Sequence, residues 1–244
     1  MTHTVYRKMT AKEYIRQFDV LLFDMDKTFM FGGNKYGNEQ DYEKTYKSFG
    51  GKKFNNSHLH EFFDFSYMKL LEKSRNPECF DAFPTVREFL DSDEYSKEFE
   101  SYEKDLIEKT FASHECGWVP DNCRKALNEL SKVHRLGLIS NVWCESIYFR
   151  DRLKEEEVYN LFDIHIFSSD HGAIKPSRKL FQVAIDHFKK KPHELVYIGD
   201  NYKRDVIGAK NAGINSILIQ NSPAGEITGD VQPDYVISGI EELM

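Results

Sequence analysis

Several features are scarce in this 244-residue sequence, and each scarcity excludes a class of protein. Four cysteines occur, and they show neither C-x-x-C spacing nor the density of a disulfide scaffold, so we expect reduced thiols. No apolar run approaches the roughly 20 residues of a membrane span. Residues 1–19 also lack the roughly 7–15 consecutive apolar residues of a secretion signal. We therefore expect a cytoplasmic protein that has no membrane partner.

Positive charge is scarce as well. The chain has 33 lysines and arginines against 40 aspartates and glutamates, which gives a formal net charge of −7 and a pI near 5.8. The basic run Lys189–Lys191 is too short to reverse this balance. A nucleic acid attracts a basic surface through its phosphates, so the composition predicts no nucleic-acid partner.

The residues that are abundant are typical of a folded, soluble protein. Hydrophobic residues make up 40% of the chain, with 19 Phe and 13 Tyr, while charged residues make up 30% and the mean hydropathy is −0.59. The length fits one large α/β domain, or a domain of about 150 residues with a smaller second one. The sequence indicates no particular oligomeric state.

Short apolar runs rich in β-branched or large aliphatic residues alternate with helical periodicity over much of the chain. Strands that alternate with helices at this spacing form a parallel sheet with helices on both faces, and ligands of such sheets bind beyond the carboxyl ends of the strands. The predicted strands are Val20–Phe23, Leu136–Ile139, Ile164–Phe167, Val196–Ile198, Ile217–Ile219 and Tyr235–Ile237. The predicted helices between them are Cys144–Tyr159, Lys179–Phe188 and Asp205–Ala212.

One segment, residues 32–117, interrupts this alternation. It has no strong strand signal, and its apolar residues recur at helical spacing, for example Leu59, Phe62, Phe63 and Tyr67. It holds 12 Lys and Arg against 18 Asp and Glu, so it carries most of the net negative charge. Glycines at both ends are natural points of chain reversal. We therefore predict a helical insertion at 32–117 within an α/β core formed by residues 1–31 and 118–244.

Chemically active side chains follow four of the predicted strands. The stretch "LLFDMDKTF" at 21–29 ends a buried strand with two carboxylates. Clustered carboxylates repel one another, and a hard cation such as Mg²⁺, which prefers oxygen ligands, removes that repulsion. Hydroxyls and a lysine nearby would then hold an anion, and phosphate is the anion that accompanies Mg²⁺. The residues that follow the four strands are Asp24, Asp26, Thr28, Ser140, Asn141, Lys175, Asp200 and Asp205.

These residues lie in four motifs that resemble the ordered motifs of the haloacid dehalogenase superfamily of hydrolases. The motifs are "DMDKT" at 24–28, "LISN" at 138–141, "IKPS" at 174–177 and "GDNYKRD" at 199–205. The resemblance covers roughly residues 18–31 and 118–220. One departure is Lys27, where the commonest form of the first motif has glycine; the family tolerates other residues there, so we expect catalysis to survive.

The resemblance implies a role for each matching residue. Asp24 would be the nucleophile that attacks phosphorus and forms an aspartyl-phosphate, and Asp26 would be the general acid and base. Thr28, Ser140 and Asn141 would bind the phosphoryl group, whose charge Lys175 would neutralise. Mg²⁺ would be held by the Asp24 side chain, the Asp26 backbone carbonyl and the Asp200 carboxylate, with Asp205 placing a ligand or a coordinated water.

The spacing of the motifs places the insertion within this family. Asp24 and Ser140 are 116 positions apart, whereas Ser140 to Lys175 spans 35 and Lys175 to Asp200 spans 25. Only the first interval accommodates a further domain. The insertion at 32–117 therefore resembles the helical cap that this family places between its first and second motifs, where it closes over the site and sets specificity.

The resulting prediction is a Mg²⁺-dependent phosphatase that hydrolyses a small phosphomonoester metabolite, such as a sugar phosphate, phosphoglycolate or a nucleoside monophosphate. A phosphomutase of the same superfamily remains an alternative, because no residue pattern separates it from a phosphatase. A 2-haloacid dehalogenase is disfavoured by Asp26 and Asp200, since halide leaves without protonation and that reaction uses no metal. A catalytically silent phosphoprotein-binding module is disfavoured because all four motifs are complete.

Overall fold

A six-stranded parallel β-sheet forms the centre of the molecule, with the strand order β3-β2-β1-β4-β5-β6. The computed structural model describes residues 9–92, 99–221 and 226–244. All six strands lie where the sequence predicts them, and three of them are two residues longer than predicted. Their bounds are β1 Val20–Phe23, β2 Arg135–Ser140, β3 Ile164–Phe167, β4 Leu195–Gly199, β5 Asn215–Ile219 and β6 Tyr235–Ile237.

Side chains of the central strands point alternately to the two faces of the sheet, and both faces are buried. In β1, Leu21 and Phe23 belong to one hydrophobic core, whereas Val20 and Leu22 belong to a second core on the opposite face. A continuous apolar run of this kind is typical of a parallel strand that is covered on both sides. The predicted α/β fold, a parallel sheet with helices on both faces, is confirmed.

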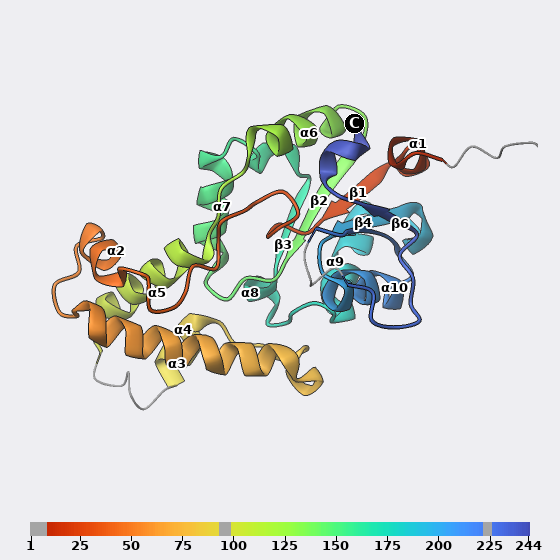
Figure 1. Ribbon diagram of the computed structural model, residues 1–244. Coiled ribbons are helices and arrows are strands. Elements are labelled where there is room, and N and C mark those ends of the chain that lie inside the picture. The colour runs from red at the N-terminus through yellow and green to blue at the C-terminus, as the bar shows by residue number, and fades with distance from the viewer. Residues whose placement is uncertain (1–8, 93–98, 222–225) are drawn as a thin grey trace, which may run out of the picture.

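Helices cover the sheet on both sides (Figure 1). On one side lie α1 Ala11–Ile15, α6 Asp121–Ser131, α7 Ser146–Glu155 and the 3₁₀ turn Ile240–Leu243, and on the other lie α9 Arg178–Phe188 and α10 Ile207–Asn211. A short helix, α8 Ser168–His171, follows β3. The predicted helix at 144–159 is shorter than expected and is followed by a 3₁₀ turn at Tyr159–Leu161. Throughout the described ranges, no helix is both long and apolar enough to cross a membrane.

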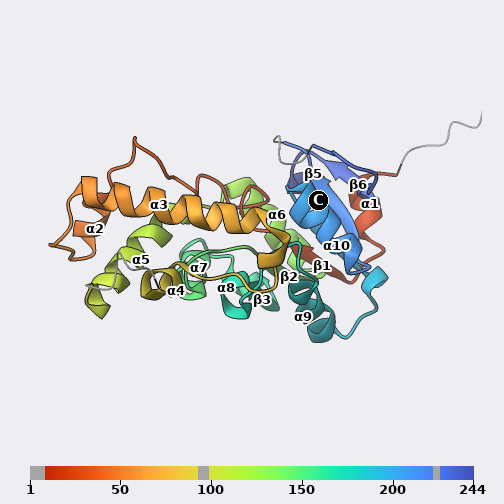
Figure 2. The same ribbon diagram turned by 90° about the horizontal axis from the view of Figure 1, so that it is seen from below.

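The segment between β1 and β2 is helical, as the sequence predicts. Its elements are α2 Tyr42–Ser48, α3 Asn56–Arg75, the 3₁₀ turn Pro77–Cys79, α4 Val86–Ser92 and α5 Ser101–Glu115. Figures 1 and 2 place these helices to one side of the sheet. At the root of the segment, the backbones of Phe31 and Trp118 form two hydrogen bonds of 2.8 and 2.9 Å. This pairing supports the division at 31/32 and 117/118, which stays a prediction; we refer to residues 32–117 as the insertion.

Helix α5 fixes the insertion to the loop that follows β2. Its Glu115 carboxylate accepts hydrogen bonds from the backbone N–H groups of Trp143 (2.8 Å) and Cys144 (3.3 Å), and its Glu108 accepts one from Glu145 N–H (3.0 Å). Both glutamates are at least nine-tenths buried. Burial, as the largest cause, raises the pKa of each to about 7. Two buried carboxyls therefore join the insertion to the core.

The raised pKa of Glu108 predicts a loss of stability with increasing pH. Its pKa is about 7 in the folded protein against an ordinary value of 4.5, so the folded state favours the neutral form. Stability from this group is complete below pH 4.5 and falls as pH rises to 7, by a total on the order of 3 kcal/mol. We expect Glu108→Gln, whose amide stays neutral, to flatten the profile of unfolding free energy between pH 5 and 8. Denaturant unfolding at several pH values measures this profile, and Glu72→Gln, at an exposed position, is the control. The prediction would be contradicted if the unfolding free energy changed with pH equally steeply in both variants.

Candidate active site

Lys175 lies at the centre of the candidate site and is itself almost completely buried. Its Nζ donates hydrogen bonds to Asp24 Oδ1 (2.7 Å), Asp205 Oδ1 (2.8 Å) and Tyr197 Oη (2.7 Å). Burial alone would lower its pKa, but the two carboxylates outweigh burial and raise the pKa above its ordinary value. All three ammonium protons have fixed partners. Lys175 is therefore a permanent cation that orients Asp24 from one side.

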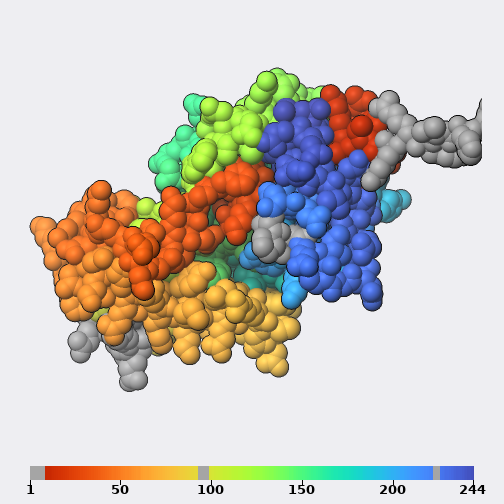
Figure 3. All heavy atoms as spheres, viewed as in Figure 1, coloured from red at the N-terminus to blue at the C-terminus, as the bar shows by residue number. Residues whose placement is uncertain are grey.

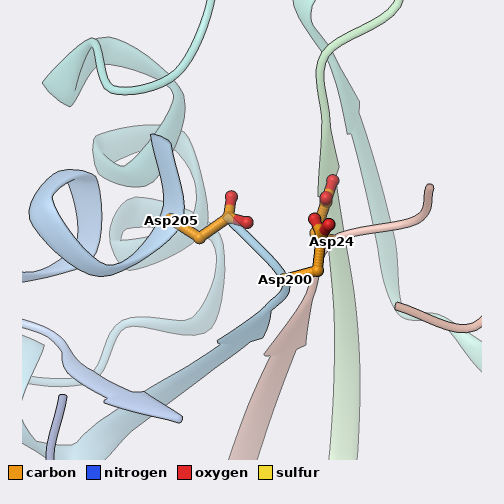
Figure 4. Close-up of side chains that lie close together, drawn as sticks. All are labelled: Asp24, Asp200 and Asp205. Atoms are coloured by element: carbon orange, nitrogen blue, oxygen red, sulfur yellow. The ribbon is translucent and has the colours of Figure 1, made fainter. Parts of the chain in front are cut away.

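Three carboxylates meet at the carboxyl ends of β1 and β4. Oxygens of Asp24, Asp200 and Asp205 all lie within 4.8 Å of one another, and all three residues are buried (Figure 4). Burial, followed by the charges of Asp205 and Asp24, raises the pKa of Asp200 to about 8. Burial likewise raises the pKa of Asp24 to about 6, against the opposing effect of Lys175.

The cluster fits a hard divalent cation. Asp200 Oδ2 is buried and has no hydrogen-bond partner among the described residues, so this oxygen is available as a ligand. A cation next to it would remove the repulsion between the carboxylates and lower both raised pKa values. The Asp26 carboxylate is not part of the cluster. Ligation by Asp24, Asp26, Asp200 and Asp205 stays a prediction.

Asp205 reaches the cluster through local backbone geometry that the sequence pattern does not predict. The predicted helix at 205–212 is instead a π-helical turn, Tyr202–Val206, followed by the short α10. The wider turn brings the Asp205 side chain back over Gly199, where an added Cβ would lie 2.5 Å from the carboxyl group. Asp205 Oδ2 also accepts a hydrogen bond from Asn201 N–H (2.9 Å). With both oxygens engaged, Asp205 holds Lys175 in place.

Asp26 lies in the turn after β1, where its carboxylate accepts a hydrogen bond from Asn34 Nδ2 at 2.9 Å. Burial is the main reason that its pKa is raised above the ordinary value. A raised pKa favours the protonated form, which is the form that a general acid requires. Asn34 belongs to the start of the insertion, and its N–H donates to Glu115 O (3.2 Å).

Lys27, which directly follows Asp26 in the first motif, has the positive φ angle of 58°. This left-handed conformation costs an L-residue about 1–2 kcal/mol, whereas glycine adopts it freely at an entropic cost of about 0.5–1 kcal/mol. The preference for glycine at this position of the motif thus has a conformational reason.

We expect Lys27→Gly to keep most of the turnover and to raise the unfolding free energy by up to about 1 kcal/mol, because the relief of strain exceeds the added chain entropy. Thermal unfolding and a phosphatase assay measure both effects. Lys125→Gly, on the exposed side of α6, is the matched control and should destabilise by about 1 kcal/mol. Equal destabilisation by the two substitutions would contradict this interpretation of Lys27.

The three predicted phosphate-binding groups other than Lys175 differ in their positions. Ser140 and Asn141 line the same pocket as Asp24 and Asp26. The Asn141 side chain bonds to the backbone of Lys175, accepting from N–H (2.7 Å) and donating to the carbonyl (3.3 Å), so it positions the lysine. Thr28 does not line this pocket, although its Oγ1 is buried without a partner among the described residues. Phosphate binding by these residues stays a prediction.

Several residues of the site were not predicted from the sequence. Tyr197, inside β4, accepts a hydrogen bond from Lys175 and donates one to Ile139 O (2.9 Å). The hydroxyl of a tyrosine in a buried strand needs a polar partner, and this need was the one sequence signal that could have indicated Tyr197. The pocket is also lined by Glu115, Trp143 and Arg204, as well as Asn34. No local pattern indicates these residues, because they come from the insertion and from loops.

The arrangement as a whole suits chemistry on an anionic substrate. A buried carboxylate, Asp24, is oriented by Lys175 and lies in a cluster with two further acids, Asp200 and Asp205, that suits a cation. A second carboxyl with a raised pKa, Asp26, lines the same small pocket. The parallel sheet and this carboxyl-rich edge are typical of an α/β enzyme, and the candidate site lies beyond the ends of β1, β2 and β4.

Comparison with known proteins identifies the family. Residues 21–219 match the family model of haloacid dehalogenase-like hydrolases, and the chain belongs to this family. The motifs predict this family.

Similar proteins include phosphatases. The chain is 26% identical over 152 residues to haloacid dehalogenase-like hydrolase domain-containing protein 3 of Xenopus laevis, covering 62% of this chain and 61% of that protein. It is 30% identical over 102 residues to glyceraldehyde 3-phosphate phosphatase of Methanothermobacter thermautotrophicus, covering 42% of this chain and 44% of the relative. The matches thus span about half the length of these relatives.

Solved structures agree on the fold. The crystal structure of a HAD phosphatase from Thermococcus onnurineus superposes with a TM-score of 0.60 at 24% identity, covering 93% of this chain and 96% of the other. A 2-haloacid dehalogenase from Pseudomonas syringae superposes with a TM-score of 0.63 at 18% identity, with the same coverage. At these identities the fold is common to both activities and does not distinguish between them.

Proposed function

We propose that the protein is a Mg²⁺-dependent phosphatase that hydrolyses a small phosphomonoester metabolite in the cytoplasm. The observation that carries the proposal is the cluster of Asp24, Asp200 and Asp205 next to Lys175, because it offers both a cation site and a fixed cation around one potential nucleophile. Phosphatases among the relatives support the reaction class. The acidic composition supports a small-molecule substrate over a nucleic acid.

The chain's own residues account for two displacement steps. A carboxylate oxygen of Asp24 attacks phosphorus while Asp26 gives its proton to the leaving oxygen, which yields an aspartyl-phosphate and the free alcohol. Asp26 then takes a proton from water as that water attacks phosphorus, which releases inorganic phosphate and restores Asp24. Bound Mg²⁺, held by Asp24, the Asp26 carbonyl and Asp200, would neutralise charge on the phosphoryl oxygens. Lys175 keeps Asp24 in one orientation throughout.

Asp26 is the feature that favours a phosphatase over a dehalogenase of the same fold. Burial raises its pKa and so favours a proton donor in the pocket, against the opposing effect of the hydrogen bond from Asn34, and departure of halide needs no such donor. A phosphomutase stays a second candidate, since its first step uses the same residues. In the proposed arrangement the insertion is the cap that covers the site.

A screen of phosphorylated metabolites with Mg²⁺ at neutral pH tests the proposal. We expect steady-state release of inorganic phosphate from at least one phosphomonoester, and loss of this release with Asp24→Asn. A phosphomutase would instead interconvert isomers with little net phosphate. The absence of phosphate release from every ester, together with halide release that EDTA does not inhibit, would show that the proposal is wrong.

A further inference from the structure

The pocket at Asp24 is too small for a whole metabolite. Its volume is about 60 Å³, which is room for a phosphoryl group or a few water molecules. Small-molecule sites more commonly measure about 300–1,000 Å³. The leaving group of any phosphomonoester must therefore extend into a neighbouring space.

Such a space lies between the insertion and the core. A recess of about 790 Å³ is lined by the end of α3 and the turn after it on one side and by the π-helical turn and residues 228–231 on the other. Figure 3 shows the surface hollowed between the insertion and the last third of the chain. Arg204 lines both this recess and the pocket at Asp24, so the two spaces share a wall.

The charged residues of this recess are mostly cations. Arg75, Lys203 and Arg204 line it, against a single carboxylate, Asp230. Arg75 and Lys203 form no ion pair within the described part of the chain, whereas Arg87, for example, binds two carboxylates. Arg204 differs from them, because its charge interacts with the carboxylates of the candidate active site, which raise its pKa. The recess is thus locally basic, although the insertion as a whole is acidic.

Two further observations indicate a built binding site. Tyr202 lines the recess, and its hydroxyl is buried without a hydrogen-bond partner among the described residues. The insertion wall is fixed to the core close by, because Ile174 N–H donates to Phe80 O (2.9 Å) and Lys179 Nζ donates to Asp81 O (2.7 Å). Apolar side chains, among them Leu71, Phe80 and Val231, also line the recess.

We propose that this basic recess binds a second anionic group, a carboxylate or a second phosphate, on the leaving group of the phosphomonoester. The proposal rests on the proposed phosphatase function and defines its substrate class. Cations that contact an anion on the leaving group stabilise the bound substrate and the transition state equally. The anion should therefore lower KM and leave kcat almost unchanged. A charge-assisted hydrogen bond from an arginine accounts for roughly a tenfold gain or more.

Matched pairs of esters test the substrate class. We expect kcat/KM to be roughly tenfold higher or more for the ester with the second anion in at least one of two pairs. The pairs are 3-phosphoglycerate with glycerol 3-phosphate, and fructose 1,6-bisphosphate with fructose 1-phosphate. The first pair tests a carboxylate and the second a phosphate. Equal kcat/KM values within both pairs would overturn the inference while leaving the phosphatase proposal intact. If no ester is hydrolysed with Mg²⁺, the phosphatase proposal fails and the inference fails with it.

Variants locate the effect in the recess. We expect Arg75→Gln to raise KM for the preferred anionic ester roughly tenfold with little change in kcat, and to affect that ester more than its neutral partner. Lys203→Gln should act in the same direction. Lys69→Gln removes the same charge from α3 outside the recess and should change neither ester. If Arg75→Gln and Lys203→Gln both have the same KM and kcat values for the two esters as Lys69→Gln, the recess does not bind the anion.

Discussion

Asp24→Asn should lower turnover of every phosphomonoester by at least about 10⁴-fold, because the amide cannot attack phosphorus. The structure makes this substitution informative. Asn matches Asp in shape, and Lys175 keeps its bonds to Asp205 and Tyr197 when the Asp24 charge is removed. We therefore expect the variant to stay folded, which circular dichroism and thermal unfolding measure beside the phosphate assay.

Two outcomes would contradict the assignment of Asp24. Turnover within about tenfold of the unsubstituted protein would mean that another group attacks phosphorus. Loss of activity together with loss of the folded state would mean that Asp24 is needed for folding. Asp151→Asn, the same change at an exposed position of α7, is the control for handling and expression.

Asp26→Asn should lower turnover by about 10²–10⁴-fold, the usual contribution of a general acid or base. The loss should depend on the leaving group. An alkyl ester needs protonation of its leaving oxygen, whereas an aryl ester such as 4-nitrophenyl phosphate leaves as a stable anion. We therefore expect the substitution to slow the first step far more for the alkyl ester, and single-turnover kinetics on both esters measure the difference.

Asn34→Ala provides a matched control for Asp26→Asn. It removes the hydrogen bond to the Asp26 carboxylate but keeps the carboxyl group, so the loss of turnover should be smaller than with Asp26→Asn. Equal effects of Asp26→Asn on the alkyl and aryl esters would argue against a role for Asp26 in protonating the leaving group.

The fold could be predicted from sequence because its signals are local. A strand such as Val20–Phe23 is a continuous apolar run, and its position in a parallel sheet follows from the helices that alternate with the strands. The convergence of Asp24, Lys175 and Asp200 could also be predicted, because each follows a strand and parallel strands end at one edge. The structure brings these residues together as expected.

The remaining parts of the site depend on contacts between distant segments, which leave no local signal. Asn34 and Glu115 reach the pocket from the two ends of the insertion, and only the docked insertion brings them there. The π-helical turn that carries Asp205 has no sequence pattern distinct from an α-helix. The same reason applies to the basic recess, whose cations come from α3 and from the turn after β4.

The most direct test of the central proposal is phosphate release from one phosphomonoester, measured with Mg²⁺ and again after addition of EDTA. We predict release with Mg²⁺, loss of release with EDTA and recovery when Mg²⁺ is restored, because the proposed cation at Asp24, Asp200 and Asp205 would neutralise the clustered carboxylates and the phosphoryl group. Phosphate release that EDTA leaves unchanged would contradict the metal site, and no release under either condition would contradict the phosphatase.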